Sequence, residues 1–176
     1  MLHGLQIWVA LPKHLEECEP AFFHADGPLL PVWTNQDIQL KLIAGTAFGR
    51  TSPIPVHSSL YLIELKSTTK QTLKIGEELY GESGIYILEG GIESDGHVFG
   101  PRQLLVAKDS SLCEFTLLEN SCIYIFGGDA FPEERFIFWN FVASDKALIE
   151  QAKERWRKQE FDKVPGESEF VPLPGS

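Results

Sequence analysis

Along most of the chain, hydrophobic residues fall into short runs that are separated by turn residues, and several runs alternate with polar positions. The clearest alternation lies in residues 38–48, where Ile38, Leu40 and Leu42 share one parity. A period of two is that of a β-strand with one buried face. Strands are predicted at residues 5–11, 38–48, 58–65, 72–75, 85–88, 97–99, 104–107, 113–118 and 121–126.

Two stretches carry apolar side chains on both parities. In residues 58–65, Leu60 and Leu62 lie on one face of the predicted strand, and Tyr61 and Ile63 lie on the other. Such a strand is expected to be covered on both faces. Residues 136–141 have the same character, with bulky side chains at nearly every position, and we expect them to pack beneath the following helix.

Turn residues divide the predicted strands at short intervals. Asp95-Gly96 is a strong two-residue hairpin signal, and Gly90-Gly91 and residues 109–111 mark further turns. This spacing favours a sandwich or barrel over alternating strands and helices. The fold class predicted from the pattern is therefore all-β.

One amphipathic helix is predicted near the end of the chain, at residues 145–160. Leu148, Ala152 and Trp156 recur at four-residue steps, and Ser144 is a suitable N-cap. Pro165-Gly166 ends the pattern, and the remaining residues are expected to form an extended tail.

Composition and charge narrow the class of protein. The chain has 176 residues, 43% of them hydrophobic, which is enough for one domain, or one domain and a tail, with a core that needs no disulfide or metal. A formal net charge of −10 disfavours nucleic acid as a partner. The one basic group, at residues 153–158, falls where cations complement the dipole of the predicted helix.

The cellular setting is predicted to be cytoplasmic. The first residues show no basic segment followed by an apolar run, and no stretch approaches the roughly 18 apolar residues of a membrane span, so no membrane association is expected. Cys18, Cys113 and Cys122 form no CxxC pair, which fits a reducing compartment. If residues 113–126 form a hairpin, Cys113 and Cys122 lie too far apart for a bridge, and buried thiols are expected.

No catalytic or metal-binding constellation is visible in the residues. The five histidines, His3, His14, His24, His57 and His97, share no spacing typical of a metal site. The adjacent pairs Glu16-Glu17, Glu77-Glu78 and Glu133-Glu134 are expected to be solvated, because neighbours on a strand point to opposite faces.

Several strings, taken in order, resemble the pirin family of cupin proteins. They are HGLQIWVALP at residues 3–12, LIAGTA at 42–47, YILEG at 86–90, WNFV at 139–142 and PGESEFVPLP at 165–174. The resemblance implies a cupin double-stranded β-helix, or jelly-roll barrel, with one C-terminal α-helix. It implies four segments: an interdomain lead strand (1–12), the barrel (13–143), the helix (144–163) and an extended tail (164–176).

The resemblance places this chain on the second of the two tandem cupin domains of the family. Family members hold an iron-like metal through three histidines and a glutamate of the first domain, and no position of this sequence matches that motif. General cupins place histidines before and after the YILEG-like strand, but residues 74–80, Glu82 and residues 100–115 supply none. No metal ligand, catalytic residue or bound cofactor is therefore predicted.

The preferred hypothesis is a metal-free cupin domain that serves as a structural, protein-interaction or small-molecule-binding module. The barrel mouth is the expected place for a ligand, and Tyr61 and Tyr86 either line it or pack in the core. Apolar side chains at residues 5–9 favour a homodimer or a separate first-domain partner. The alternative is an enzyme resembling quercetin 2,3-dioxygenase, using an unconventional metal site or a partner domain.

Overall fold

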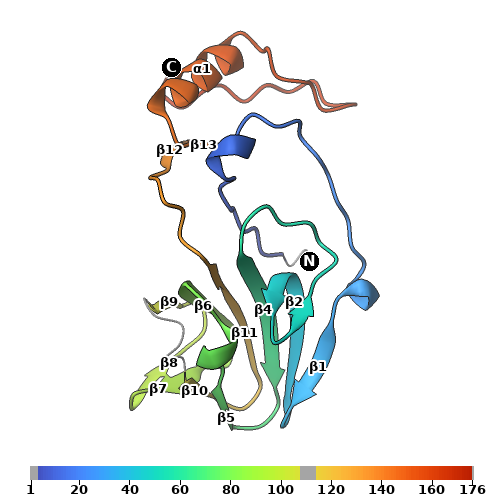
Figure 1. Ribbon diagram of the computed structural model, residues 1–176, viewed down its shortest axis with the longest axis vertical. Coiled ribbons are helices and arrows are strands. Elements are labelled where there is room, and N and C mark those ends of the chain that lie inside the picture. Colours follow the sequence, from blue (N-terminus) through green and yellow to red (C-terminus); the bar gives the residue numbers. More distant parts are fainter. Residues whose placement is uncertain (1–3, 108–113, 176) are drawn as a thin grey trace. The chain divides into compact units, whose positions relative to one another are not determined.

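A computed structural model describes residues 4–107 and 114–175, and it divides the chain into two compact units (Figure 1). Residues 20–130 form one unit, which we call the sandwich unit. Residues 1–19 and 131–176 form the other, which we call the terminal unit. The domain limits expected after residues 12, 143 and 163 remain a prediction.

Two antiparallel sheets make up the sandwich unit. The larger sheet has the order β1 (Val32–Asn35), β2 (Ile38–Ala47), β4 (Leu60–Ser67), β11 (Ser121–Gly128), β6 (Glu82–Glu89) and β9 (Leu104–Ala107), with β3 (Arg50–Thr51) paired to β2. The smaller sheet has the order β5 (Gln71–Lys74), β10 (Glu114–Leu117), β7 (Ile92–Ser94) and β8 (His97–Phe99). Short 3-10 turns lie at η2 (Gly27–Leu29) and η3 (Gly76–Glu78).

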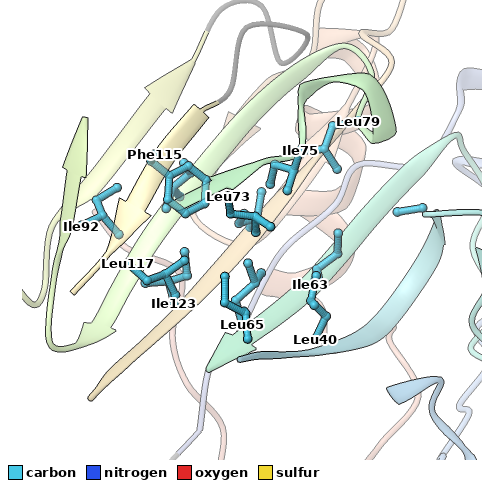
Figure 2. Close-up of a cluster of buried hydrophobic side chains, with 14 of the residues drawn as sticks. Leu40, Ile63, Leu65, Leu73, Ile75, Leu79, Ile92, Phe115, Leu117 and Ile123 are labelled. Carbon is cyan, nitrogen blue, oxygen red and sulfur yellow. The ribbon is translucent and has the colours of Figure 1, made fainter. Parts of the chain in front are cut away.

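The core of this unit lies between the two sheets. Figure 2 shows Leu73, Phe115 and Leu117 of the smaller sheet gathered with Leu65 and Ile123 of the larger one. Ile38, Leu40 and Leu42 of β2 are buried at alternate positions as predicted, but the register shifts between Leu42 and Ala44, and beyond it the other parity is buried. The central strand β4 is buried on both parities over much of its length. The all-β jelly-roll class with a single C-terminal helix is confirmed.

The Asp95-Gly96 hairpin is also confirmed. Ser94 and His97 face each other across β7 and β8, so the turn has two residues, and both have positive φ angles, 50° at Asp95 and 75° at Gly96. This is the type I′ geometry that Asp-Gly favours.

The hairpin predicted at residues 113–126 is wrong. β10 pairs with β5 and β7, whereas β11 pairs with β4 and β6, so residues 118–120 carry the chain from one sheet to the other. Two strands joined by a short turn can either pair as a hairpin or cross from one sheet to the other. The packing of the two sheets against each other decides between these arrangements. Cys122 is a buried free thiol, while Cys113 lies outside the described residues.

The terminal unit contains a short hairpin and the helix. β12 (Phe136–Phe138) pairs with β13 (Phe141–Ala143), and α1 (Lys146–Arg157) packs against both strands. The helix begins later than predicted, because Asp145 is its N-cap and accepts a hydrogen bond from the backbone N–H of Ala147 at 2.8 Å. The expected packing of residues 136–141 beneath the helix holds for Phe138 and Phe141, but Ile137 is exposed.

The strand predicted at residues 5–11 is wrong. The described part of this segment, from Gly4, pairs with no strand in residues 4–107 and 114–175, and Leu5, Trp8 and Val9 are exposed. Its apolar composition satisfies the sequence rule for a strand, but no neighbouring strand in the described residues supplies the hydrogen bonds that a strand requires. The 3-10 turn η1 (Lys13–Leu15) follows it.

Trp156 of α1 holds the C-terminal tail. Its indole N–H donates to the carbonyl of Val171 at 2.8 Å, and its ring stacks on Phe170 with centroids 5.7 Å apart. Leu173 is buried beyond these contacts. Among the residues that the structure describes, no helix has the length and apolar composition of a membrane span.

Candidate functional site

A cavity of about 930 Å³ opens in the sandwich unit where both sheets end. β9 is the last strand of the larger sheet and β8 is the last strand of the smaller sheet (Figure 1). Both strands contribute residues to the lining of the cavity. A sandwich whose sheets do not join along this side leaves a gap that side chains from opposite faces only partly fill. The volume lies in the range of sites that enclose small molecules.

The inner part of the cavity is apolar. Its residues are Ile85, Ile92, Phe99, Leu105 and Phe115, drawn from five strands. Each of them also belongs to the core or packs against it, because each has the parity that faces the opposite sheet. The inner part is therefore held by packed strands on both sides, which gives it a fixed shape.

The outer part of the cavity carries three carboxylates, those of Glu93, Asp95 and Glu114, beside the exposed apolar residues Leu104 and Val106. Lys70 Nζ lies 2.8 Å from a carboxylate oxygen of Glu93, and Lys74 Nζ lies 2.9 Å from one of Glu114. Asp95, at the tip of the hairpin, makes no ion pair with a described residue. His97 lines the same side, its ring 6.5 Å from that of Phe99 between centroids.

A second polar group surrounds Glu64, a buried carboxylate of β4. It accepts a hydrogen bond from the Tyr124 hydroxyl at 2.8 Å, and the Nζ atoms of Lys41 and Lys66 lie 3.2 and 3.0 Å from it. Burial alone would raise the pKa of this carboxyl, but the three donors outweigh burial and lower it. Because its oxygens are satisfied within the sheet, this group stabilises the fold and offers no free chemistry.

Burial and hydrogen bonds also raise the pKa values of three groups around Glu64, those of Tyr124, Lys66 and Cys122. Burial and the hydrogen bond donated to Glu64 raise the pKa of the Tyr124 hydroxyl well above its ordinary value. The bond to Glu64 raises the pKa of the Lys66 ammonium group, and burial raises that of the Cys122 thiol. At neutral pH, Tyr124 and Cys122 are thus protonated, so neither is an activated nucleophile.

The two tyrosines considered for the barrel mouth lie elsewhere. Tyr61 is a core residue whose hydroxyl lies 2.6 Å from that of Ser83, and its ring meets Tyr80 edge-on at 5.2 Å. Gly127 is required beside it, because a Cβ there would lie 2.1 Å from the backbone carbonyl oxygen of Glu82 and 2.5 Å from the Tyr61 hydroxyl oxygen. Tyr86 is half-buried beside Tyr124 and does not line the cavity. The core-packing alternative thus holds for Tyr61.

The structure does not bring the described histidines of the sequence together. His14, His57 and His97 are exposed at distinct places, His24 pairs with Asp26 at 3.0 Å, and His3 lies outside the described residues. Within residues 4–107 and 114–175, no three His, Cys, Asp or Glu side chains gather as metal ligands. The described donor set does not fit the iron site that the resemblance implies for the family.

Glu16 departs from the solvated state predicted for the adjacent glutamates. Its side chain is 7% exposed and lies against Arg135, whereas Glu77 and Glu78 are exposed as expected. Glu133 is half-buried, and one of its carboxylate oxygens is buried without a hydrogen-bond partner among the described residues. The prediction assumed that each pair of glutamates lies on a strand. It fails for Glu16 and Glu133 because both lie in irregular segments.

Comparison with known proteins identifies the family. The profile of the Pirin C-terminal cupin domain matches residues 61–162. This chain belongs to the pirin family. A pirin-like protein of Caulobacter vibrioides is 39% identical over 176 residues, which cover 98% of this chain and 60% of that protein.

Two further relatives carry names that refer to an activity. A Pseudomonas aeruginosa protein named for quercetin 2,3-dioxygenase activity is 32% identical over 157 residues, covering 89% of this chain and 49% of that protein. The crystal structure of quercetin 2,3-dioxygenase from Acinetobacter baumannii superposes with a TM-score of 0.84 at 27% identity, covering 95% of this chain and 56% of that one. This pirin-family chain spans about half of the length of such relatives.

Proposed function

We propose that this pirin-family chain is a ligand-binding cupin domain that is not catalytic by itself, and that the cavity beside β8 and β9 is its binding site. The observation that carries the proposal is the lining of that cavity. Five apolar side chains form its inner part, and polar groups gather only at its opening. Binding sites for small molecules have this division, since apolar contact supplies affinity and a few polar groups supply orientation.

The absence of catalytic activity is proposed from the chemistry of the side chains. In the described part of the chain, the cavity holds one imidazole and three carboxylates, two of which are already paired with lysines. First-row metals in cupin-type sites need several such donors directed at one point. The described residues also place no activated serine, cysteine or lysine in the cavity lining.

Titration with quercetin tests the proposal, because the names of the relatives supply this probe. We expect saturable binding followed by fluorescence, without consumption of the flavonol when oxygen is present. Leu105→Trp, which would fill the inner cavity, is expected to weaken binding by at least about tenfold. Val98→Trp is the matched control, because Val98 is exposed on β8 and does not line the cavity.

A second variant separates blocked binding from misfolding. Phe99→Ala enlarges the cavity and removes an aromatic contact, so it should also weaken binding while thermal unfolding remains cooperative. Equal affinity of both cavity variants and the unaltered protein would show that the probe binds elsewhere. The proposal would be overturned if neither quercetin nor any of three simpler aromatic probes, 2-naphthylmethylammonium, 2-naphthalenemethanol and 2-naphthoate, binds.

The second candidate function is quercetin 2,3-dioxygenase activity that this chain performs together with further protein. The similarity to the Acinetobacter baumannii enzyme favours it. Elemental analysis of the purified protein and a flavonol-depletion assay under oxygen test whether this chain is active by itself, and repetition of the assay with a first-domain protein added tests the second candidate. Stoichiometric iron, nickel or copper together with turnover by this chain alone would overturn the non-catalytic proposal.

A further inference from the structure

We propose that the cavity selects flat aromatic molecules that carry a positive charge over anionic molecules of the same skeleton. The inference rests on the proposed function and adds the chemical class of the ligand. The distribution of charge around the opening supports it.

Acidic groups outnumber basic groups among the described residues that line the cavity. Glu93, Asp95 and Glu114 are carboxylates, and His97 is the only basic residue among the described lining residues. Neither lysine nor arginine belongs to that described lining. An anionic ligand would lose water around its charge and find no ammonium or guanidinium group in the described lining to replace it.

The carboxylates differ in how far they are already neutralised. Lys70 and Lys74 pair with Glu93 and Glu114, and both lysines lie outside the lining. Asp95 has no such partner among the described residues and stands at the tip of the β7–β8 hairpin. The type I′ turn fixes the Asp95 backbone at the cavity opening, because Ser94 and His97 close the hairpin on either side of it. Asp95 is thus the group best placed to meet a ligand cation.

The aromatic residues of the cavity suit the ring system of such a ligand. Phe99 and Phe115 come from β8 and β10, and both lie in the inner part of the cavity. Aromatic rings attract both flat apolar rings and cations held near their faces. A ligand with its ring system inside and its ammonium group near Asp95 would satisfy both parts of the cavity at once.

Three probes that share one ring system test the inference. They are 2-naphthylmethylammonium, 2-naphthalenemethanol and 2-naphthoate, titrated by fluorescence at low ionic strength. We expect the cation to bind about tenfold more tightly than the anion, with the alcohol between them, and the difference to shrink as salt is added. Equal affinities, or tighter binding of the anion, would overturn the charge selection and leave the proposed binding site standing.

Asp95→Asn is the decisive variant. Asn-Gly favours the same type I′ turn as Asp-Gly, so the hairpin is expected to keep its geometry while it loses the charge. Affinity for the cation should fall several-fold, and affinity for the alcohol should not change. Asp129→Asn removes the same net charge at an exposed site that does not line the cavity, and it should leave all three affinities unchanged.

The outcomes distinguish the two proposals. If none of the three probes binds and quercetin also fails, the cavity is not a binding site and both proposals are overturned. If the probes bind and Leu105→Trp weakens all of them, but Asp95→Asn changes none, the binding site stands and the role of Asp95 is overturned. An equal effect of Asp95→Asn and Asp129→Asn would show that net charge alone sets the preference.

Discussion

The carboxylate of Glu16 lies 3.2 Å from Nε of Arg135, and this buried ion pair joins the two separate segments of the terminal unit. Both side chains are nearly withdrawn from solvent, at 7% and 12% exposed. The Glu16 oxygens also accept bonds from the backbone N–H and the hydroxyl of Ser144, each at 2.8 Å. Arg135 in turn donates to the carbonyl of Leu11.

Removal of one partner of this ion pair should strongly destabilise the terminal unit. Glu16→Ala leaves the nearly buried Arg135 guanidinium with only the more distant carboxylate of Glu133, 3.8 Å away, and loss of the close partner of a buried pair costs up to about 3 to 5 kcal/mol. We expect the free energy of unfolding of this unit to fall by that amount. The matched control is Glu17→Ala, which alters an exposed neighbour and should change it by less than about 0.5 kcal/mol.

Tryptophan fluorescence can report the terminal unit separately. Three of the four tryptophans, Trp8, Trp139 and Trp156, lie in that unit, so a Trp33→Phe background removes the signal of the sandwich unit. Combination of Glu16→Ala with Arg135→Met should cost less than the sum of the two single changes, because the charge that each single change leaves without its close partner is then absent as well. Additive effects would contradict the pairing.

Acid should weaken the sandwich unit through Glu64. Because its pKa is lowered in the folded chain, this carboxyl contributes stability that is complete above its ordinary pKa of about 4.5 and is lost as the pH falls through the lower folded value. Urea unfolding between about pH 7 and about pH 3 should therefore show a steeper loss for the unaltered protein than for Glu64→Gln.

The same variant has a cost at neutral pH. Glu64→Gln leaves Lys41 and Lys66 without their carboxylate and should lower the free energy of unfolding by about 1 to 3 kcal/mol near pH 7. Glu77→Gln, at an exposed site of the same unit, serves as the comparison and should be close to neutral. Parallel pH profiles for the unaltered protein and Glu64→Gln would show that Glu64 has no shifted pKa.

Trp156 should determine whether the tail stays folded against the helix. Trp156→Phe keeps an aromatic ring but loses the hydrogen bond to Val171, which should cost about 1 kcal/mol. Trp156→Ala also removes the stacking on Phe170 and should cost about 3 to 5 kcal/mol.

Limited proteolysis followed by mass spectrometry measures this effect. Cleavage after residue 163 should accelerate slightly in Trp156→Phe and strongly in Trp156→Ala, while Val142→Ala, at an exposed position of the same unit, should match the unaltered protein. Equal cleavage of all four proteins would show that the tail does not depend on Trp156.

The strands were predictable where local periodicity determines them. The alternation at Ile38, Leu40 and Leu42 locates β2, and Asp95-Gly96 locates a turn, because both signals lie within a few neighbouring residues. The partners of β10 and β11 were not predictable in this way. Their pairing depends on which strands from distant parts of the sequence lie beside them, and the short turn at residues 118–120 is compatible with either result.

The candidate site was largely hidden in the sequence for the same reason. Its inner residues, such as Phe99 and Phe115, have the ordinary strand pattern of core residues, and the cavity lies where the edge strands β8 and β9 of two different sheets are not paired with each other. Asp95 was noticed only as part of a turn, and His97 only as one of five histidines without the spacing of a metal site. Glu16 was taken as solvated, because its partner Arg135 is far away in the sequence.

The arrangement of the two units constrains the order in which the protein can be completed during synthesis. The sandwich unit is one continuous stretch, residues 20–130, whereas the terminal unit needs segments from both sides of it. A ribosome releases the partner of Glu16 only after every sandwich strand has emerged, so the sandwich unit can fold first. Until Arg135 and Ser144 have been synthesised, the Glu16 carboxylate has neither of the partners that hold it in the completed terminal unit.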